Sequence, residues 1–269
     1  MTASGERSGT QADSGVRVLV TSGFGVTVLD VAGDSVERYA LVEDCTALDV
    51  TRVGSRVAVA TPDDVLVGDG SEFEESGFGP AVAVGGDPLL AADPSGNLSR
   101  LGVEWESIGS LDTNVTAIDG DLVGTEDGVF RVVDGDVEHV GLSDVTDVAA
   151  GGIPHAATED GLYKLGAGWM RVLEGSFTLV AAASESEETL RRAHAATAEE
   201  LFQFDGEDWT RWHIPVDSPV AGIDYGESVY AVFEEGTMIT VADGEWRTRS
   251  LGLRDVTGLL VMAGQEDRS

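Results

Sequence analysis

Short runs of apolar or alternating apolar and polar residues follow one another along the chain, separated by turns rich in Gly, Asp and Glu. Residues 121–140, DLVGTEDGVFRVVDGDVEHV, contain a turn, a strand, a second turn and a second strand. Gly and Asp tolerate the positive φ angles that tight hairpin turns require. The pattern therefore predicts short antiparallel strands joined by hairpins.

Near-copies of this stretch recur along the chain at intervals of about 32 to 40 residues. The seven copies begin at Arg17, Arg56, Leu89, Leu122, Pro154, Ala193 and Val229. Each copy contains three short strands, and most are preceded by a fourth apolar run such as CTALDV or VTAIDG. Seven repeats of four antiparallel strands predict a seven-bladed β-propeller.

The two ends of the repeat region complement each other. The first copy has no fourth run before it, whereas the last copy is followed by the unassigned run VTGLLVM at 256–262. We therefore expect this C-terminal strand to pair into the first blade as its innermost strand, which closes the ring and removes an open edge. The expected organisation is one propeller domain over 16–262 between disordered tails at 1–15 and 263–269.

The stretches TEDGVFRVVDGDVEHV and TEDGLYKLGAGWMRV resemble the short propeller repeats of sensor domains in two-component regulators, whose pattern is T-x-D-G-L-[FY] followed by G-x-W. From Val16 to Met262 the chain also resembles an uncharacterised β-propeller family of haloarchaea. Three copies depart from the motif, with TPDDVLV, DPSGNLS and FEEGTMI in its place. The resemblance implies a cytoplasmic propeller and no assigned activity, because the motif consists of turn and packing residues.

The chain is strongly acidic, with 49 acidic and 16 basic residues and a formal net charge of −33. Repulsion among these charges opposes folding in dilute salt, whereas molar salt shortens the Debye length to about 3 Å. This balance is typical of proteins from a high-salt cytoplasm. An acidic surface that binds cations or a basic partner is the alternative, but the even spread of the acidic residues favours a solvating role.

Composition also limits the function classes. No basic patch is present to neutralise phosphates, so we expect no direct nucleic-acid binding. No apolar run reaches the roughly 18 residues of a membrane span, and the first residues lack the apolar core of a secretory signal, so we expect a cytoplasmic protein. Cys45 is the only cysteine, which rules out an intrachain disulfide and a cysteine metal cluster.

The motifs of common enzyme classes are missing from the sequence. It contains no GxxxxGK[ST] phosphate loop, no GxSxG elbow, no HExxH zinc motif and no EF-hand calcium loop. The box S-x-D-x-G-x-x-W of sialidase-like propellers is also absent. We therefore expect a protein that is not an enzyme and needs no cofactor.

Two histidines occupy the same position of neighbouring repeats, His155 in PHAATEDGL and His194 in AHAATAEEL. Two such side chains could face one cleft and hold a metal ion or relay a proton. The other repeats have mostly apolar residues at this position, so the histidines could equally be packed core residues, and no third ligand can be assigned.

Three aspartates, Asp49, Asp119 and Asp224, occupy the fifth position of their innermost runs, whereas Asp147 falls at a different position. If these side chains project toward one mouth of the central channel, they could bind a cation. Solvation of the strand ends is the alternative.

Most of the tryptophans share one position at the start of the outermost strand, namely Trp105, Trp169, Trp209 and Trp246. They are expected to fill the gaps between neighbouring blades, with a ring of stacking side chains for a ligand as the alternative.

Two segments interrupt the regular repeat and are candidates for partner recognition. Residues 183–192, ASESEETLRR, extend a loop in which a short helix could form. Residues 209–218, WTRWHIPVDS, contain Trp209 and Trp212, and Trp and Arg are enriched at interface hot spots. A tolerated surface insertion and an ordinary alternating strand are the respective alternatives.

Together these features favour a monomeric, non-catalytic scaffold that binds a protein partner. A small-ligand or cation-binding propeller, or an enzyme with its site at the channel mouth, is the alternative.

The acidic composition predicts that the protein is less stable in dilute salt. Transfer from multimolar to about 0.1 M potassium chloride should lower the melting temperature. The Debye length is then longer, so repulsion between carboxylates acts over longer distances and destabilises the folded state. Circular dichroism melts across a potassium chloride series measure this effect. A melting temperature that does not change across the series contradicts the expectation.

Overall fold

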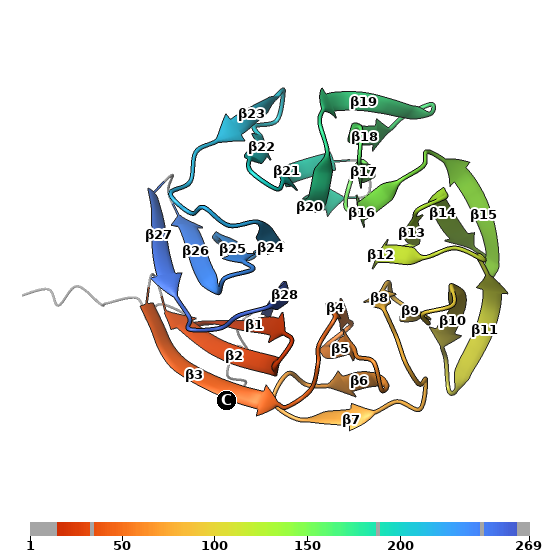
Figure 1. The fold of residues 1–269 in the computed structure, drawn as a ribbon, viewed down its shortest axis with the longest axis horizontal. Coiled ribbons are helices and arrows are strands. Elements are labelled where there is room, and N and C mark those ends of the chain that lie inside the picture. The colour runs from red at the N-terminus through yellow and green to blue at the C-terminus, as the bar shows by residue number, and fades with distance from the viewer. Residues whose placement is uncertain (1–14, 33–34, 187–188, 243–244, 263–269) are drawn as a thin grey trace, which may run out of the picture.

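The computed structural model of the chain describes residues 15–32, 35–186, 189–242 and 245–262. Every regular element within these ranges is a β-strand, and the strands form seven four-stranded antiparallel sheets. Figure 1 shows the sheets as blades arranged around a central axis, with one strand of each blade next to that axis. The expected seven-bladed β-propeller is therefore confirmed.

The first four blades, each from the channel outward, are built as follows. Blade 1 contains β28 (Val256–Met262), β1 (Val16–Ser22), β2 (Gly25–Ala32) and β3 (Ser35–Glu43). Blade 2 contains β4 (Asp49–Val53), β5 (Arg56–Ala60), β6 (Val65–Gly68) and β7 (Phe73–Glu75). Blade 3 contains β8 (Ala83–Gly85), β9 (Leu90–Ala92), β10 (Asn97–Leu101) and β11 (Trp105–Ser110). Blade 4 contains β12 (Val115–Asp119), β13 (Leu122–Thr125), β14 (Gly128–Val133) and β15 (Asp136–Gly141).

The remaining three blades follow the same order. Blade 5 contains β16 (Val145–Ala149), β17 (His155–Thr158), β18 (Gly161–Leu165) and β19 (Trp169–Glu174). Blade 6 contains β20 (Phe177–Ser186), β21 (Thr189–Thr197), β22 (Leu201–Phe204) and β23 (Trp209–Trp212). Blade 7 contains β24 (Val220–Tyr225), β25 (Val229–Phe233), β26 (Thr237–Ala242) and β27 (Glu245–Ser250).

The ring is closed by pairing between the two ends of the chain. Strand β28 lies antiparallel to β1, with Leu19 opposite Leu260 and Val18 opposite Val261. Figure 1 shows the blue C-terminal strand beside the red N-terminal strand at the channel. The expected closure by residues 256–262 is therefore confirmed. The expected tails, 1–15 and 263–269, lie outside the described residues except for Gly15.

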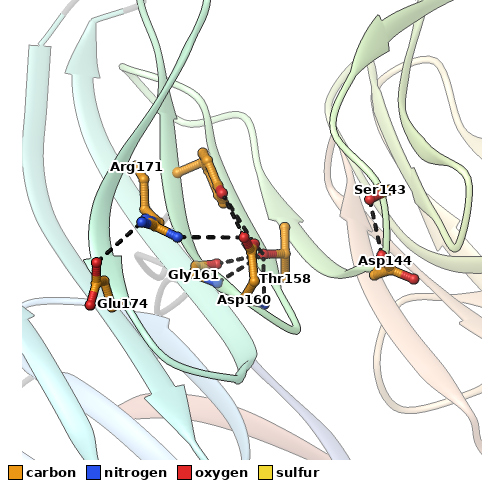
Figure 2. A network of polar contacts seen from close by, with 8 residues as sticks. Ser143, Asp144, Thr158, Asp160, Gly161, Arg171 and Glu174 are labelled. Atoms are coloured by element: carbon orange, nitrogen blue, oxygen red, sulfur yellow. Dashed lines mark hydrogen bonds and ion pairs between the residues drawn. The ribbon is translucent and has the colours of Figure 1, made fainter.

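The repeated Thr-Glu-Asp-Gly sequence forms the turn between the second and third strands of a blade. In blade 5 the backbone N–H of Gly161 donates to the Thr158 hydroxyl at 3.0 Å, and that hydroxyl lies 2.9 Å from the Gly161 carbonyl oxygen. Figure 2 shows that Arg171 of β19 reaches Asp160 in the same turn, at 3.5 Å, and Glu174 at 3.1 Å. The motif is therefore structural, because its side chains hold their own turn.

The hydrophobic core lies between the blades. Val26 and Val28 of blade 1 pack with Val57 and Val59 of blade 2, and comparable clusters occupy the other interfaces. The indole N–H of Trp169 donates to the Val140 carbonyl of blade 4 at 3.0 Å. Trp105 donates to the Ser76 hydroxyl just after blade 2, and Trp209 packs on His155 of blade 5, as the packing interpretation of the tryptophan position expects. Trp246, in contrast, is 36% exposed.

The strand pairing corrects two of the expectations from the sequence, one about equivalent aspartates and one about a helix. Asp49 lies opposite Ala60 and is therefore equivalent to Asp147, which lies opposite Ala157, and not to Asp119 or Asp224. In the described part of the insertion, residues 183–186 and 189–192 belong to strands β20 and β21 of a long hairpin and not to the expected helix. The two strands remain paired into the insertion, with Ala183 opposite Arg192.

Removal of the closing strand tests the role of this pairing. Deletion of residues 256–269 should unfold or oligomerise the protein, because β1 then exposes an unpaired edge at the channel. Deletion of 263–269 alone is the control and should leave a folded monomer. Size-exclusion chromatography and thermal melting at high potassium chloride distinguish the two variants. A stable monomer that lacks residues 256–269 contradicts the closure argument.

Candidate functional site

The central channel is a cavity of about 280 Å³ that is lined by the innermost strands of several blades. Its polar side chains are Asp49, Asp147 and four threonines, and the rest of the lining consists of apolar residues. This volume is at the lower limit of the 300–1,000 Å³ that is usual for small-molecule sites. The channel is therefore the natural place to look for chemistry.

Asp49 and Asp147 make equivalent contacts in blades 2 and 5. The Val84 N–H of blade 3 donates to Asp49 Oδ2 at 2.9 Å, and the Val180 N–H of blade 6 donates to Asp147 Oδ2 at 2.8 Å. The second oxygen of each carboxyl accepts the N–H of the next residue in its own strand, at 2.8 Å in both cases.

Asp119 and Asp224 repeat the arrangement at the other end of their strands. The Ala150 N–H donates to Asp119 Oδ2 at 2.7 Å, and the Val261 N–H of β28 donates to Asp224 Oδ2 at 2.6 Å. Val261 is also held from blade 2, since the Arg52 guanidinium donates to its carbonyl oxygen. The closing strand is therefore bonded to both of its neighbouring blades.

These contacts have a common physical cause. An innermost strand has one edge that faces the channel, so some of its N–H groups have no partner in the sheet. A carboxyl oxygen of the preceding blade supplies the missing acceptor, so these N–H groups do not remain unpaired. The four aspartates thus connect consecutive blades, and the structure does not bring three of them together as a cation site.

The protein that surrounds these carboxyls changes their acidity. Asp147 and Asp49 are half-buried and line the channel. Desolvation raises the pKa of Asp147 to about 8 and that of Asp49 to about 6, against the effect of the two backbone N–H donors on each. Repulsion from neighbouring aspartates is a smaller contribution to the same two raised pKa values.

A set of threonines makes a second type of connection, which the sequence analysis missed. The hydroxyls of Thr116, Thr146 and Thr257 donate to the Val145, Phe177 and Ala47 carbonyls at 3.0, 2.8 and 2.9 Å. Each acceptor lies in the next blade or directly before its innermost strand. The signal was present in the sequence, since the runs VTAI, VTDV, FTLV and VTGL all carry Thr at their second position.

The two histidines lie in different interfaces. His155 is 2% exposed, and its ring packs against Trp209 of blade 6, with a centroid distance of 5.7 Å. His194 is 1% exposed and packs against Trp212 and against Tyr225 of blade 7. Burial lowers the pKa of both imidazoles to about 4. The structure therefore does not bring His155 and His194 to one cleft.

The contacts of His194 determine its tautomer. The Tyr225 hydroxyl donates to the Ala181 carbonyl at 3.0 Å, so His194 Nδ1 carries the proton and donates to Tyr225 Oη at 2.9 Å. His155 Nδ1 lies 2.7 Å from the Ile153 carbonyl oxygen. Among the described residues, no three His, Cys, Asp or Glu side chains are placed to hold a metal ion together.

The two tryptophans of the 209–218 segment have different surroundings. Trp209 is half-buried against His155 and Phe204, whereas Trp212 borders a small groove between blades 6 and 7. This blade 6–7 groove lies between the β21–β22 turn (197–201) and the connection that follows β23 (213–218), with Val220 and Phe233 below. Its volume is about 70 Å³.

The blade 6–7 groove and the long hairpin lie on opposite faces of the propeller. Phe177 pairs with Thr197 at one end of blade 6, the end at which Leu201 pairs with Trp212. Ser186 pairs with Thr189 at the other end. The two candidate recognition segments therefore cannot form one continuous surface.

No helix in the described ranges is long and apolar enough to cross a membrane.

A family profile described as Beta-prop_HVO_0234:-like, beta propeller, matches residues 6–262 of the chain. The chain belongs to this family. A search of curated proteins gives no match.

Solved structures with the same fold come from diverse proteins. The WD40 β-propeller domain of Doa1 is 12% identical with a TM-score of 0.64, and the match covers 80% of this chain and 86% of that one. YCF48 bound to D1 peptide is 13% identical with a TM-score of 0.58, covering 76% and 82%. The extracellular domain of the hybrid two component system BT4673 from B. thetaiotaomicron is 12% identical with a TM-score of 0.53, and the match covers 90% of this chain and 46% of that one. At these identities the likeness shows the fold alone.

The raised pKa of Asp147 predicts a pH-dependent stability. Between the unfolded value of about 3.9 and about 8, the folded protein holds a proton that the unfolded chain has released. Stability should therefore decrease as the pH rises through this window. The Asp147→Asn variant has no group at this position that can release a proton, so its free energy of unfolding should decrease less over the same pH range.

The measurement is the free energy of unfolding by denaturant at several pH values between 5 and 8.5, at constant potassium chloride. Asp134→Asn, at an exposed hairpin turn, is the control for the loss of one carboxylate. Equal slopes for the wild type and Asp147→Asn would show that Asp147 is ionised throughout this range.

Proposed function

We propose that the chain is a non-catalytic β-propeller scaffold that binds another protein in a high-salt cytoplasm. The observation that carries the proposal is the use of the channel carboxyls. Asp49, Asp119, Asp147 and Asp224 all accept backbone hydrogen bonds from a neighbouring blade. The groups best placed for catalysis thus have structural partners, and the outer surface is left as the site of function.

Two features of the surface support a protein partner. The hairpin of β20 and β21 is an extension of blade 6 on one face, and the blade 6–7 groove is a concave site on the other. A propeller of similar fold, YCF48, has been solved bound to a D1 peptide. The net charge of −33 supports a high-salt cytoplasm, because such a charge is tolerated best where it is screened.

A small-ligand or cation-binding site, or an enzymatic one, at the channel mouth is the second candidate. It is favoured by the cavity of about 280 Å³ and by the raised pKa of Asp147, which is a frequent property of functional carboxyls. A specific ligand should raise the melting temperature by mass action. A melting screen with divalent cations and small metabolites at fixed potassium chloride therefore tests this candidate.

The scaffold proposal predicts a stoichiometric protein partner. Affinity purification of the tagged chain from its native cytosol, kept throughout in concentrated potassium chloride, should recover this partner, and mass spectrometry should identify it. A folded monomer that recovers no partner would contradict the scaffold and leave the channel as the site.

Two variants then locate the contact on one face. In the first, a two-residue turn replaces residues 184–191, which removes the hairpin extension of blade 6. In the second, Ile214→Ala alters the blade 6–7 groove on the opposite face. Loss of the partner with only one of the variants assigns the binding face, provided that both variants melt as the wild type does.

A further inference from the structure

The blade 6–7 groove combines an apolar lining with acidic surroundings. Trp212, Ile214 and Val216 line it and are half-buried, and Val220 and Phe233 are buried below them. A volume of about 70 Å³ exceeds the roughly 10–15 Å³ needed by a water molecule and is well below a small-molecule pocket. The groove therefore has room for a single side chain of a partner and not for a cofactor.

The turn that borders the groove has a fixed shape. The backbone N–H groups of Glu199 and Glu200 donate to the Thr197 hydroxyl at 3.3 and 3.0 Å, and the Thr197 N–H donates to the Glu200 carbonyl at 2.9 Å. These bonds hold the backbone of the turn without using either carboxylate. Neither the Glu199 nor the Glu200 carboxylate is therefore needed to hold the turn.

The charges around the groove leave a negative excess. Arg211 pairs with Glu200 at 2.8 Å, so these two charges offset each other. Glu199 is exposed on the same turn and Asp217 is exposed on the connection. Glu234 is exposed on the neighbouring turn of blade 7, where its N–H donates to the Pro219 carbonyl at 3.1 Å.

The connection that forms one wall of the groove differs from its counterpart in blade 2. Residues 76–82 join blades 2 and 3 and are tied to the buried Asp64, whose carboxylate accepts the N–H groups of Gly77, Phe78 and Gly79. The connection at 213–219 instead presents Ile214 and Val216 to the groove. Both connections carry apolar side chains that pack on the adjoining interface, Phe78 in blade 2 and Ile214 and Val216 in blade 6, but in blade 6 they line a groove.

We propose that the blade 6–7 groove binds a basic segment of a partner protein, with one arginine or lysine side chain seated in it. This inference rests on the scaffold function proposed above and names the chemistry of the partner. The aliphatic stem of such a side chain covers the apolar lining, and its cation lies beside Glu199. Long-range attraction is screened in concentrated salt, so recognition depends on the direct contact of stem and carboxylate.

The test uses fluorescence anisotropy with a labelled nonapeptide of alternating arginine and alanine, at a potassium chloride concentration at which the full chain is folded. The control peptide carries citrulline, an uncharged arginine analogue, at the same positions. The arginine peptide should bind and the citrulline peptide should bind at least several-fold more weakly. No binding of the arginine peptide at millimolar protein overturns the proposal.

Two variants and a matched control assign the peptide to the groove. Glu199→Gln should weaken binding about three- to fivefold, the effect of one partly exposed ion pair, and Val216→Ser should weaken it further through lost apolar contact. Asp127→Asn removes a charge from the equivalent turn of blade 4 and should leave binding unchanged.

Equal binding to the wild type and Glu199→Gln, or equal losses with Glu199→Gln and Asp127→Asn, would show general attraction to an acidic surface and overturn the assignment. Concentration-dependent self-association that is abolished by Val216→Ser would make a second copy the occupant and also overturn it. If a protein partner purified with the chain still binds Glu199→Gln and Val216→Ser as tightly as the wild type, the groove assignment fails while the scaffold function stands. Absence of any partner contradicts the scaffold itself.

Discussion

The pairing of β28 with β1 holds together a ring whose seven sheets share no common ladder of backbone hydrogen bonds. It is the one place where residues from the two ends of the chain lie in the same sheet. Val261 of this strand also donates to Asp224 of blade 7 and accepts from Arg52 of blade 2. Blade 1 is therefore complete only when β28 has paired with β1 and has made these contacts with blades 7 and 2.

Between the other blades, apolar packing supplies most of the contact and a few polar groups set the relative position of the sheets. A carboxyl or a threonine hydroxyl near the channel bonds to the backbone of the next blade, as Asp147 does with Val180 and Thr146 with Phe177. Packing alone is not directional, whereas a hydrogen bond fixes distance and angle. The acidic groups in the channel thus have a structural explanation that requires no ligand.

The sequence predicted the fold well because the repeat, the turn residues and the unassigned last strand are all local patterns. It predicted the candidate site less well. The alignment placed Asp49 with Asp119 and Asp224, but Asp49 lies at the start of β4, two positions earlier in the register of its blade than those two aspartates. His155 and His194 do occupy equivalent strand positions. They lie on the second strands of their blades, however, and face two successive blade interfaces, so their equivalence in sequence does not bring them together.

Repeated positions in this chain serve the framework, so the departures from the repeat are where a specific function can be encoded. Blades 4 and 5 close their turns with Gly128 and Gly161, whereas blade 6 has Glu200 at that position. Its carboxylate pairs with Arg211, beside the apolar connection at 213–219. If the replacement of the turn glycine by Glu200 served stability alone, no apolar groove would be needed beside it. The coincidence of the altered turn, the ion pair and the groove in one blade is the strongest physical reason to place recognition there and not in the channel.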